Sequence, residues 1–215
     1  MAELTPYLFG TEVRCSDGAC GQLSRVVIDP AAMTVAGLVA EPSDPHQPGR
    51  LVPLGLLGTT PGEISLRCTE TEFFQLPHAE KAQPSPRTGT RSLRNTGLLR
   101  GRRIVVPFGG ITVRNPRPQG FTYDLLPAGK LALRGGDPVH ALDGVAGHLT
   151  GVVSATGSRQ VAYLLLHAGH LAGRNTAVPV EDVNRLDAGI QLGITRQDVR
   201  HLPPVDIGIR SGGHR

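Results

Sequence analysis

The sequence FGTEVRCSDGACGQLSRVVI, at residues 9–28, returns in altered form as GGDPVHALDGVAGHLTGVVS at residues 135–154. Sliding residues 9–77 forward by 126 positions places them on residues 135–203 without a gap, and 18 of the 69 pairs are identical. A fixed spacing kept over the length of a small domain indicates a duplicated folding unit. We therefore predict two copies of one module, joined by the residues between them.

Each copy has the pattern of short strands separated by turns, with apolar alternation typical of sheets. The strands predicted in the first copy span residues 11–15, 21–29, 34–40, 50–54 and 63–67. Those predicted in the second copy span residues 138–142, 147–154, 160–167, 176–180 and 189–194. The recurring acids Asp17 and Asp143 each precede a glycine, which is typical of hairpin turns, so we assign both to turn geometry.

Both copies end in the same helix signal. Thr69 is followed three residues later by Glu72, and Thr195 by Asp198, which is the spacing of a capping box, and a proline follows each segment. The predicted fold is all-β: two small β-barrels of five to six strands, each with a short C-terminal helix, in a pseudo-twofold relation.

The expected organisation has five segments. They are a first barrel at 1–77, a basic Pro/Arg-rich linker at 78–96, short β segments at 97–130, a second barrel at 131–205 and a flexible tail at 206–215. No run of apolar residues is long enough for a membrane span, and the first residues lack the pattern of a signal peptide. We therefore expect a cytoplasmic protein without a transmembrane segment.

The three cysteines, Cys15, Cys20 and Cys68, all lie in the first copy. Their counterparts in the second copy are Ala141, Ala146 and Ile194, which predicts buried thiols that pack as small apolar groups. A three-cysteine metal site is the alternative, although the chain has no C-x-x-C pair and no evident fourth ligand.

Several stretches of the second copy resemble the PRC-barrel family: Val139–Gly144 with Gly147, Val161–Leu166, Val178–Val180 before Val183, and Ile190–Leu192 with Thr195–Pro204. This small all-β module forms the cytoplasmic part of the H subunit of photosynthetic reaction centres and the C-terminal half of the ribosome-maturation factor RimM. The resemblance covers about 140 of the 215 residues. Tandem members of an actinobacterial group carry a Gly-His-Leu-Trp-Gly-like loop, which here runs from Gly169 to Arg174 with Ala172 in place of the aromatic residue.

The resemblance implies an adaptor or scaffold rather than an enzyme. The chain also lacks nucleophile-elbow, phosphate-loop and dinucleotide-binding motifs, so we predict a non-enzymatic protein-interaction module without a cofactor. The candidate interaction loop contains His170, Leu171 and Arg174, beside strand edges near Pro53 and Pro179. His167 and His170 have the spacing of a metal-binding pair, but their position in a strand-to-loop segment favours ordinary surface histidines.

The middle of the chain is strongly basic. Residues 78–120 contain nine Lys or Arg residues and a single acid. The candidate basic patch consists of Arg91, Arg94, Arg100, Arg102 and Arg103. We expect a solvated connector, with RNA or ribosome association as the alternative, since clustered arginines attract phosphate. A membrane-complex-associated subunit like the reaction-centre H subunit is a second alternative, and the sequence leaves open whether the chain forms a homodimer.

Overall fold

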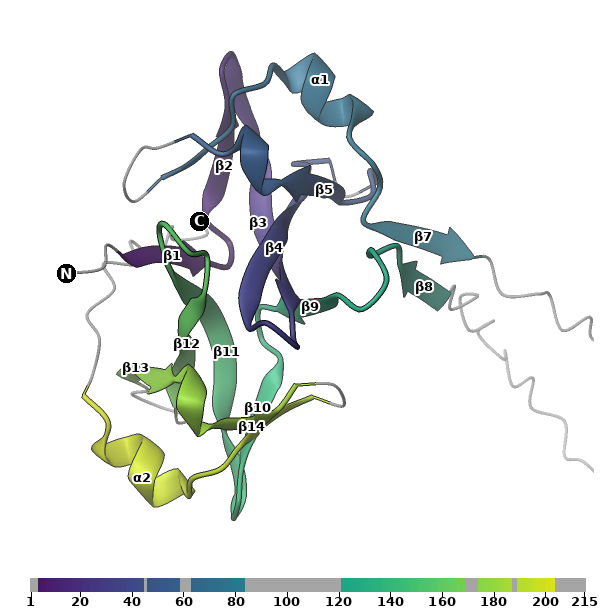
Figure 1. Ribbon diagram of the computed structural model, residues 1–215. Coiled ribbons are helices and arrows are strands. Elements are labelled where there is room, and N and C mark those ends of the chain that lie inside the picture. Colours follow the sequence, from purple (N-terminus) through teal and green to yellow (C-terminus); the bar gives the residue numbers. More distant parts are fainter. Residues whose placement is uncertain are drawn as a thin grey trace, which may run out of the picture. The chain divides into compact units, whose positions relative to one another are not determined.

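The computed structural model describes residues 4–44, 46–58, 63–83, 121–168, 174–186 and 189–203 (Figure 1). The chain divides into two units, one made of residues 1–80 and 124–215 and the other of residues 81–123. The larger unit contains both sequence copies and consists mainly of β-strands. Strands β7 (Glu80–Gln83) and β8 (Phe121–Asp124) pair with each other in a separate two-stranded sheet.

The first copy forms one sheet and one short helix. Its elements are β2 (Glu12–Cys15), β3 (Gly18–Asp29), β4 (Thr34–Glu41), β5 (Arg50–Pro53), the 3-10 helix η1 (Leu54–Leu56), β6 (Ile64–Ser65) and α1 (Glu70–Gln75). The strand order is β5-β4-β3-β2-β6, antiparallel except for β2 beside β6. Each strand predicted in this copy is therefore present, with shifts of a few residues at the ends.

The second copy repeats this arrangement. Its elements are β10 (Pro138–Ala141), β11 (Gly144–Ala155), β12 (Val161–Ala168), β13 (Arg174–Pro179), η2 (Val180–Asp182), β14 (Val183–Arg185), β15 (Ile190–Leu192) and α2 (Arg196–His201). The order is β13-β12-β11-β10-β15-β14. Strand β14 was not expected, and its counterpart in the first copy is the single bridge between Leu57 and Leu66.

A strand that precedes each copy pairs with the sheet of the other copy. Strand β1 (Leu4–Leu8) runs antiparallel to β11, with Tyr7 opposite Val152. Strand β9 (Leu131–Arg134) runs antiparallel to β3, with Leu133 opposite Val26. Adding 126 to Tyr7 gives Leu133, and subtracting 126 from Val152 gives Val26, so the two copies complete each other's sheets reciprocally.

The turns between β3 and β4 and between β11 and β12 also meet reciprocally. Thr34 forms an isolated antiparallel bridge with Gln160, its own counterpart in the other copy. The Val35 N–H donates to the carbonyl of Arg159, and the Val161 N–H donates to the carbonyl of Met33, both at 2.8 Å. Met33 and Arg159 both adopt positive φ angles, 49° and 59°. Such angles are unfavourable for residues with a side chain, and the two hydrogen bonds help to stabilise them.

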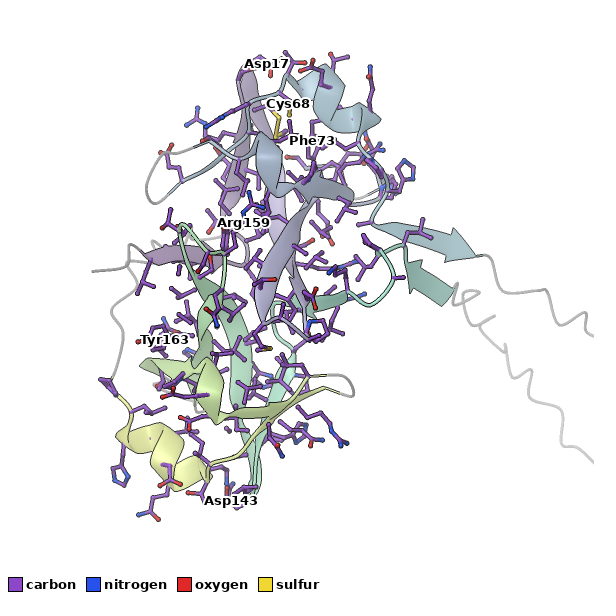
Figure 2. The ribbon with its side chains drawn as sticks, in the orientation of Figure 1. Asp17, Cys68, Phe73, Asp143, Arg159 and Tyr163 are labelled. Atoms are coloured by element: carbon purple, nitrogen blue, oxygen red, sulfur yellow. A yellow bond between two sulfur atoms is a disulfide. The ribbon has the colours of Figure 1, made fainter. Side chains whose placement is uncertain are left out.

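A single cluster of buried apolar side chains spans both copies. It combines Val26 and Leu38 from the first sheet with Val152 and Leu164 from the second, and Phe73 of α1 is completely buried in it. Figure 2 shows Phe73 directed from α1 towards the first sheet. Tyr7 of β1 and Leu133 of β9, both buried, belong to the same cluster, so strand exchange joins the two copies into one core.

Neither hydrogen-bonded sheet closes on itself within the described residues. The end strands β5 and β6 are joined through η1, and the end strands β13 and β14 through η2. The mostly β class predicted from the sequence is therefore present, arranged as two sheets.

Candidate functional site: an arginine-lined cavity

A cavity of about 560 Å³ lies beside the first sheet, where β9 of the second copy joins it. Its polar and charged lining comes from Gln22, Ser24, Arg25, Glu41, Ser43 and Arg134. This volume falls within the range of small-molecule sites, roughly 300–1,000 Å³. No sequence motif marks this cavity, because its residues come from four separate segments of the chain.

Arg25 is the most deeply buried charged residue of the cavity. It lies in β3 and is only 5% exposed. A β-bulge lies between Leu23 and Arg25, and the Ser24 hydroxyl donates to the carbonyl of Val39 at 3.2 Å. The bulge interrupts the ladder and re-aims the side chains that follow it, so it sets the direction of Arg25.

A second arginine faces the first across the exchanged strand. Arg134 of β9 lies directly opposite Arg25 in the β3–β9 register, and both line the cavity. Like charges placed directly opposite each other destabilise a sheet. The Glu41 carboxylate lies 3.7 Å from the Arg25 guanidinium, and the Glu41 side chain is 48% exposed.

The backbone brings Glu41 close to this site. Gly21 packs against the end of β4, and a Cβ atom there would lie 2.2 Å from the carbonyl oxygen of Glu41. Only glycine allows this approach. Gly21 and Gly147 are one of the identical pairs of the repeat. The close packing at Gly21 explains why this position is a glycine.

The polar residues that recur in both copies stabilise the fold. Asp17 accepts a hydrogen bond from the backbone N–H of Glu70 at 2.8 Å, and Asp143 accepts one from that of Arg196 at 2.7 Å. Each acid thus caps the first turn of a helix, as Figure 2 shows for Asp17 beside α1 and Asp143 near α2. The hairpins are confirmed, but Gly18 pairs with Cys15, so the two turn residues are Ser16 and Asp17 rather than Asp17 and Gly18.

Both predicted capping boxes are confirmed. The Thr69 and Thr195 hydroxyls accept from the N–H groups of Glu72 and Asp198, whose carboxylates accept in return from the threonine N–H groups. The bonds from Thr195 lower the pKa of Asp198, and the backbone N–H of Arg196 lowers the pKa of Asp143. The shorter Asp198 therefore performs the role of a glutamate.

The cysteine prediction needs a correction. All three cysteines are buried, but Cys15 and Cys20 form a disulfide across the β2–β3 hairpin rather than two free thiols. The hairpin places both residues on the interior side of the same turn, which spacing alone does not show. Cys68 is a free, buried thiol, and burial is the main cause of its raised pKa.

The predicted interaction loop and basic patch fall outside the described residues. This applies to His170, Leu171, the Arg174 side chain and the patch of Arg91, Arg94, Arg100, Arg102 and Arg103. His167 is exposed, and its Nδ1 lies 3.3 Å from Oδ1 of Asn175 on β13. The edge of β5 next to Pro53 is contacted by residues 77–79, since the Leu51 N–H donates to the carbonyl of Pro77 at 2.8 Å.

The described part of the chain has no cluster of three or more His, Cys, Asp or Glu residues with the geometry of a metal site. Within the same part, none of the helices has the length and apolar character needed to traverse a bilayer. In comparisons with known proteins, no family model matches this chain and none of the curated proteins does.

Proposed function

We propose that this protein is a non-enzymatic interaction module of the PRC-barrel type, built from two barrel-like copies. The observation that carries the proposal is that the polar residues shared by both copies form hydrogen bonds that stabilise the fold. Asp17 and Asp143 cap helices, and Thr69 and Thr195 close capping boxes. A residue that both copies retain for folding needs no catalytic explanation.

The copies differ where their loops leave the sheets, and this difference supports a docking role for the second copy. Strands β4 and β12 are equivalent, but the loop after β4 is proline-rich whereas Gly169–Arg174 contains histidine and arginine. Loops on a rigid sheet are common binding elements because the scaffold fixes their ends. We propose that His170 and Arg174 contact a protein partner.

An affinity purification from the native host, followed by reconstitution with the purified partner, tests this proposal. The double variant His170→Ala/Arg174→Ala should lose the partner while its unfolding transition stays unchanged. Arg200→Ala/His201→Ala, on exposed positions of α2, is the matched control and should retain binding. Equal capture by the loop variant and the unmodified protein would remove this loop as the docking surface.

The proposal places the protein in the cytoplasm, where thiols are kept reduced. The Cys20 Sγ lies 3.3 Å from the carbonyl of Val13, so a reduced thiol would have an acceptor for its proton. The Cys15–Cys20 disulfide of the structure would then be reduced in the cell, so alkylation of intact cells followed by mass spectrometry should find the two cysteines unlinked. A quantitative disulfide in freshly quenched cells would contradict the cytoplasmic location while leaving the interaction role untouched.

A further inference from the structure

We propose that the outer edge of β13 is a strand-docking site, and that residues 205–209 of the same chain, here called the tail strand, occupy it. Strand β13 lies at the end of its sheet, and within the described residues only β12 pairs with it (Figure 1). An edge strand presents unpaired N–H and C=O groups, which are a template for another strand. The inference does not rest on the protein partner proposed for the loop at 169–174.

The equivalent edge in the first copy is covered by the chain that follows α1. Residues 77–79 run along β5, and the bridge between the two segments is antiparallel. The Leu51 N–H donates to the carbonyl of Pro77 at 2.8 Å. The Ala79 N–H donates to the carbonyl of Gly49, also at 2.8 Å. The first copy therefore shows how the residues after the helix close the sheet edge.

The chain leaves both helices in the same way. Leu76, the C-cap of α1, has φ −60° and ψ 152°, and Leu202, the C-cap of α2, has φ −62° and ψ 145°. A proline follows each of them, Pro77 and Pro203. Because two dihedral angles per residue set the path of the backbone, the chain after α2 is directed towards β13 as the chain after α1 is towards β5.

An offset of 126 residues gives the register of the tail strand. The Ala177 N–H would donate to the carbonyl of Pro203. The Val205 N–H would donate to the carbonyl of Asn175. Position 204 would direct its backbone nitrogen away from β13, so Pro204 is compatible with an edge strand there.

The sequence of the tail strand, VDIGI, fits this role. Its three apolar residues alternate with Asp206 and Gly208, which is the period of a half-buried strand, and all three are β-branched. The register places Asp206 directly opposite Arg174, the first residue of β13. Opposite charges at facing positions stabilise a strand pair, most closely where the pair is not hydrogen-bonded, as here.

The first copy also shows which apolar residues the added strand covers. Ala79 is completely buried and packs against Val27 and Val39. The equivalents of these two valines in the second sheet are Val153 and Leu165, which are both buried. A valine at position 205 would enlarge the apolar contact that Ala79 makes in the first copy.

NMR of the full-length protein tests the pairing directly. We expect a nuclear Overhauser effect between the Hα atoms of Thr176 and Pro204, which would form a close, non-hydrogen-bonded pair. The Ala177 amide should exchange slowly with solvent, as the Leu51 amide does, at both low and high protein concentration. Absence of the Overhauser effect or fast exchange at Ala177 would overturn the proposal. Protection that is lost on dilution would also overturn it, because it would assign the edge to a second copy of the chain.

Two proline variants test whether the tail strand protects Ala177. Val205→Pro removes the N–H that would donate to Asn175, and it should speed exchange of the Ala177 amide at least about fivefold. Gly208→Pro is the same change beyond the residues that face β13, and it should leave the exchange rate unchanged. Equal rates in Val205→Pro and the unmodified protein would overturn the proposal.

A charge exchange tests the register. Asp206→Arg and Arg174→Asp should each speed exchange at Ala177 about threefold, because like charges would then face each other. The double variant restores an opposite pair and should return to the rate of the unmodified protein. The Leu51 amide is the internal control and should keep its rate in all three variants. A double variant that exchanges as fast as the single ones would overturn the register and the proposal with it.

Discussion

Asp17 and Asp143 illustrate how one residue can satisfy two local patterns. Each precedes a glycine in a hairpin, and each also accepts a hydrogen bond from a helix N–H that lies 53 residues further along the chain. The hairpin role was predictable because turn signals are local. The capping role was not, because the helix reaches the acid only after the whole copy has folded.

Removing these caps should destabilise the protein. We expect Asp17→Ala to lower the free energy of unfolding by about 0.5–2 kcal/mol, the usual cost of losing a side chain that caps a helix. Asp143→Ala should act in the same direction, and the two effects should add because the sites are far apart in the two copies. Urea unfolding followed by circular dichroism measures both. Glu63→Ala, at an exposed acid, serves as the control, and a loss equal to that of Asp17→Ala would refute the capping role.

The lowered pKa of Asp29 leads us to expect a specific dependence of stability on pH. The Lys130 ammonium, 2.5 Å away, and the Ala32 N–H lower its pKa below the ordinary value of 3.8. Because the folded-state pKa is depressed, the stabilisation is fully present above the unfolded-state pKa and is lost as the pH falls through the folded-state value. Asp29→Asn should therefore flatten the loss of stability below about pH 4. An acid unfolding profile identical to that of the unmodified protein would contradict this assignment.

At the scale of elements, the strands inside each copy were predictable and the strands exchanged between copies were not. Val26, Val27 and Val35 recur at equivalent positions of the second copy. The alternation of apolar residues and the repeat therefore both predicted strands β3 and β4. Strand β1 had no counterpart inside the repeated region. Strand β9 was assigned to its own copy, since no local signal records a partner more than 100 residues away in sequence.

Leu133 offers a test of the exchanged pairing. It is 2% exposed and lies opposite Val26, so Leu133→Ala should cost about 2–5 kcal/mol of stability. Leu125→Ala, at a residue that is 48% exposed, should change stability by less than about 0.5 kcal/mol. Native-state hydrogen exchange should show faster opening of β3 and β4 in the Leu133 variant. Faster exchange restricted to the second copy would contradict the pairing.

The cavity could not be predicted from the sequence repeat alone. Arg25 interrupts the apolar run of β3, and its counterpart is Gly151, so the substitution between copies was visible as a difference. Its meaning depends on Arg134, which lies more than 100 residues away and reaches the same place only through strand exchange. The site can be found by comparing the two copies position by position, once it is known that β9 pairs with β3.

At the scale of the molecule, the two copies form one interdependent structure. Each sheet takes one strand from outside its own copy, and the buried cluster includes Tyr7 and Leu133 from those strands. The chain therefore differs from two independent modules on a linker. Each sheet is complete only with a strand from outside its own copy, so we expect the two copies to unfold together.

Fragment complementation distinguishes reciprocal strand exchange from two independent modules. Residues 1–83 and 121–215 would be produced as separate chains and studied alone and mixed, by circular dichroism, size-exclusion chromatography and urea unfolding. We predict that neither fragment is a stably folded monomer, and that an equimolar mixture yields a heterodimer with a single cooperative transition. Two fragments that each unfold cooperatively as monomers, with no change on mixing, would contradict reciprocal strand exchange.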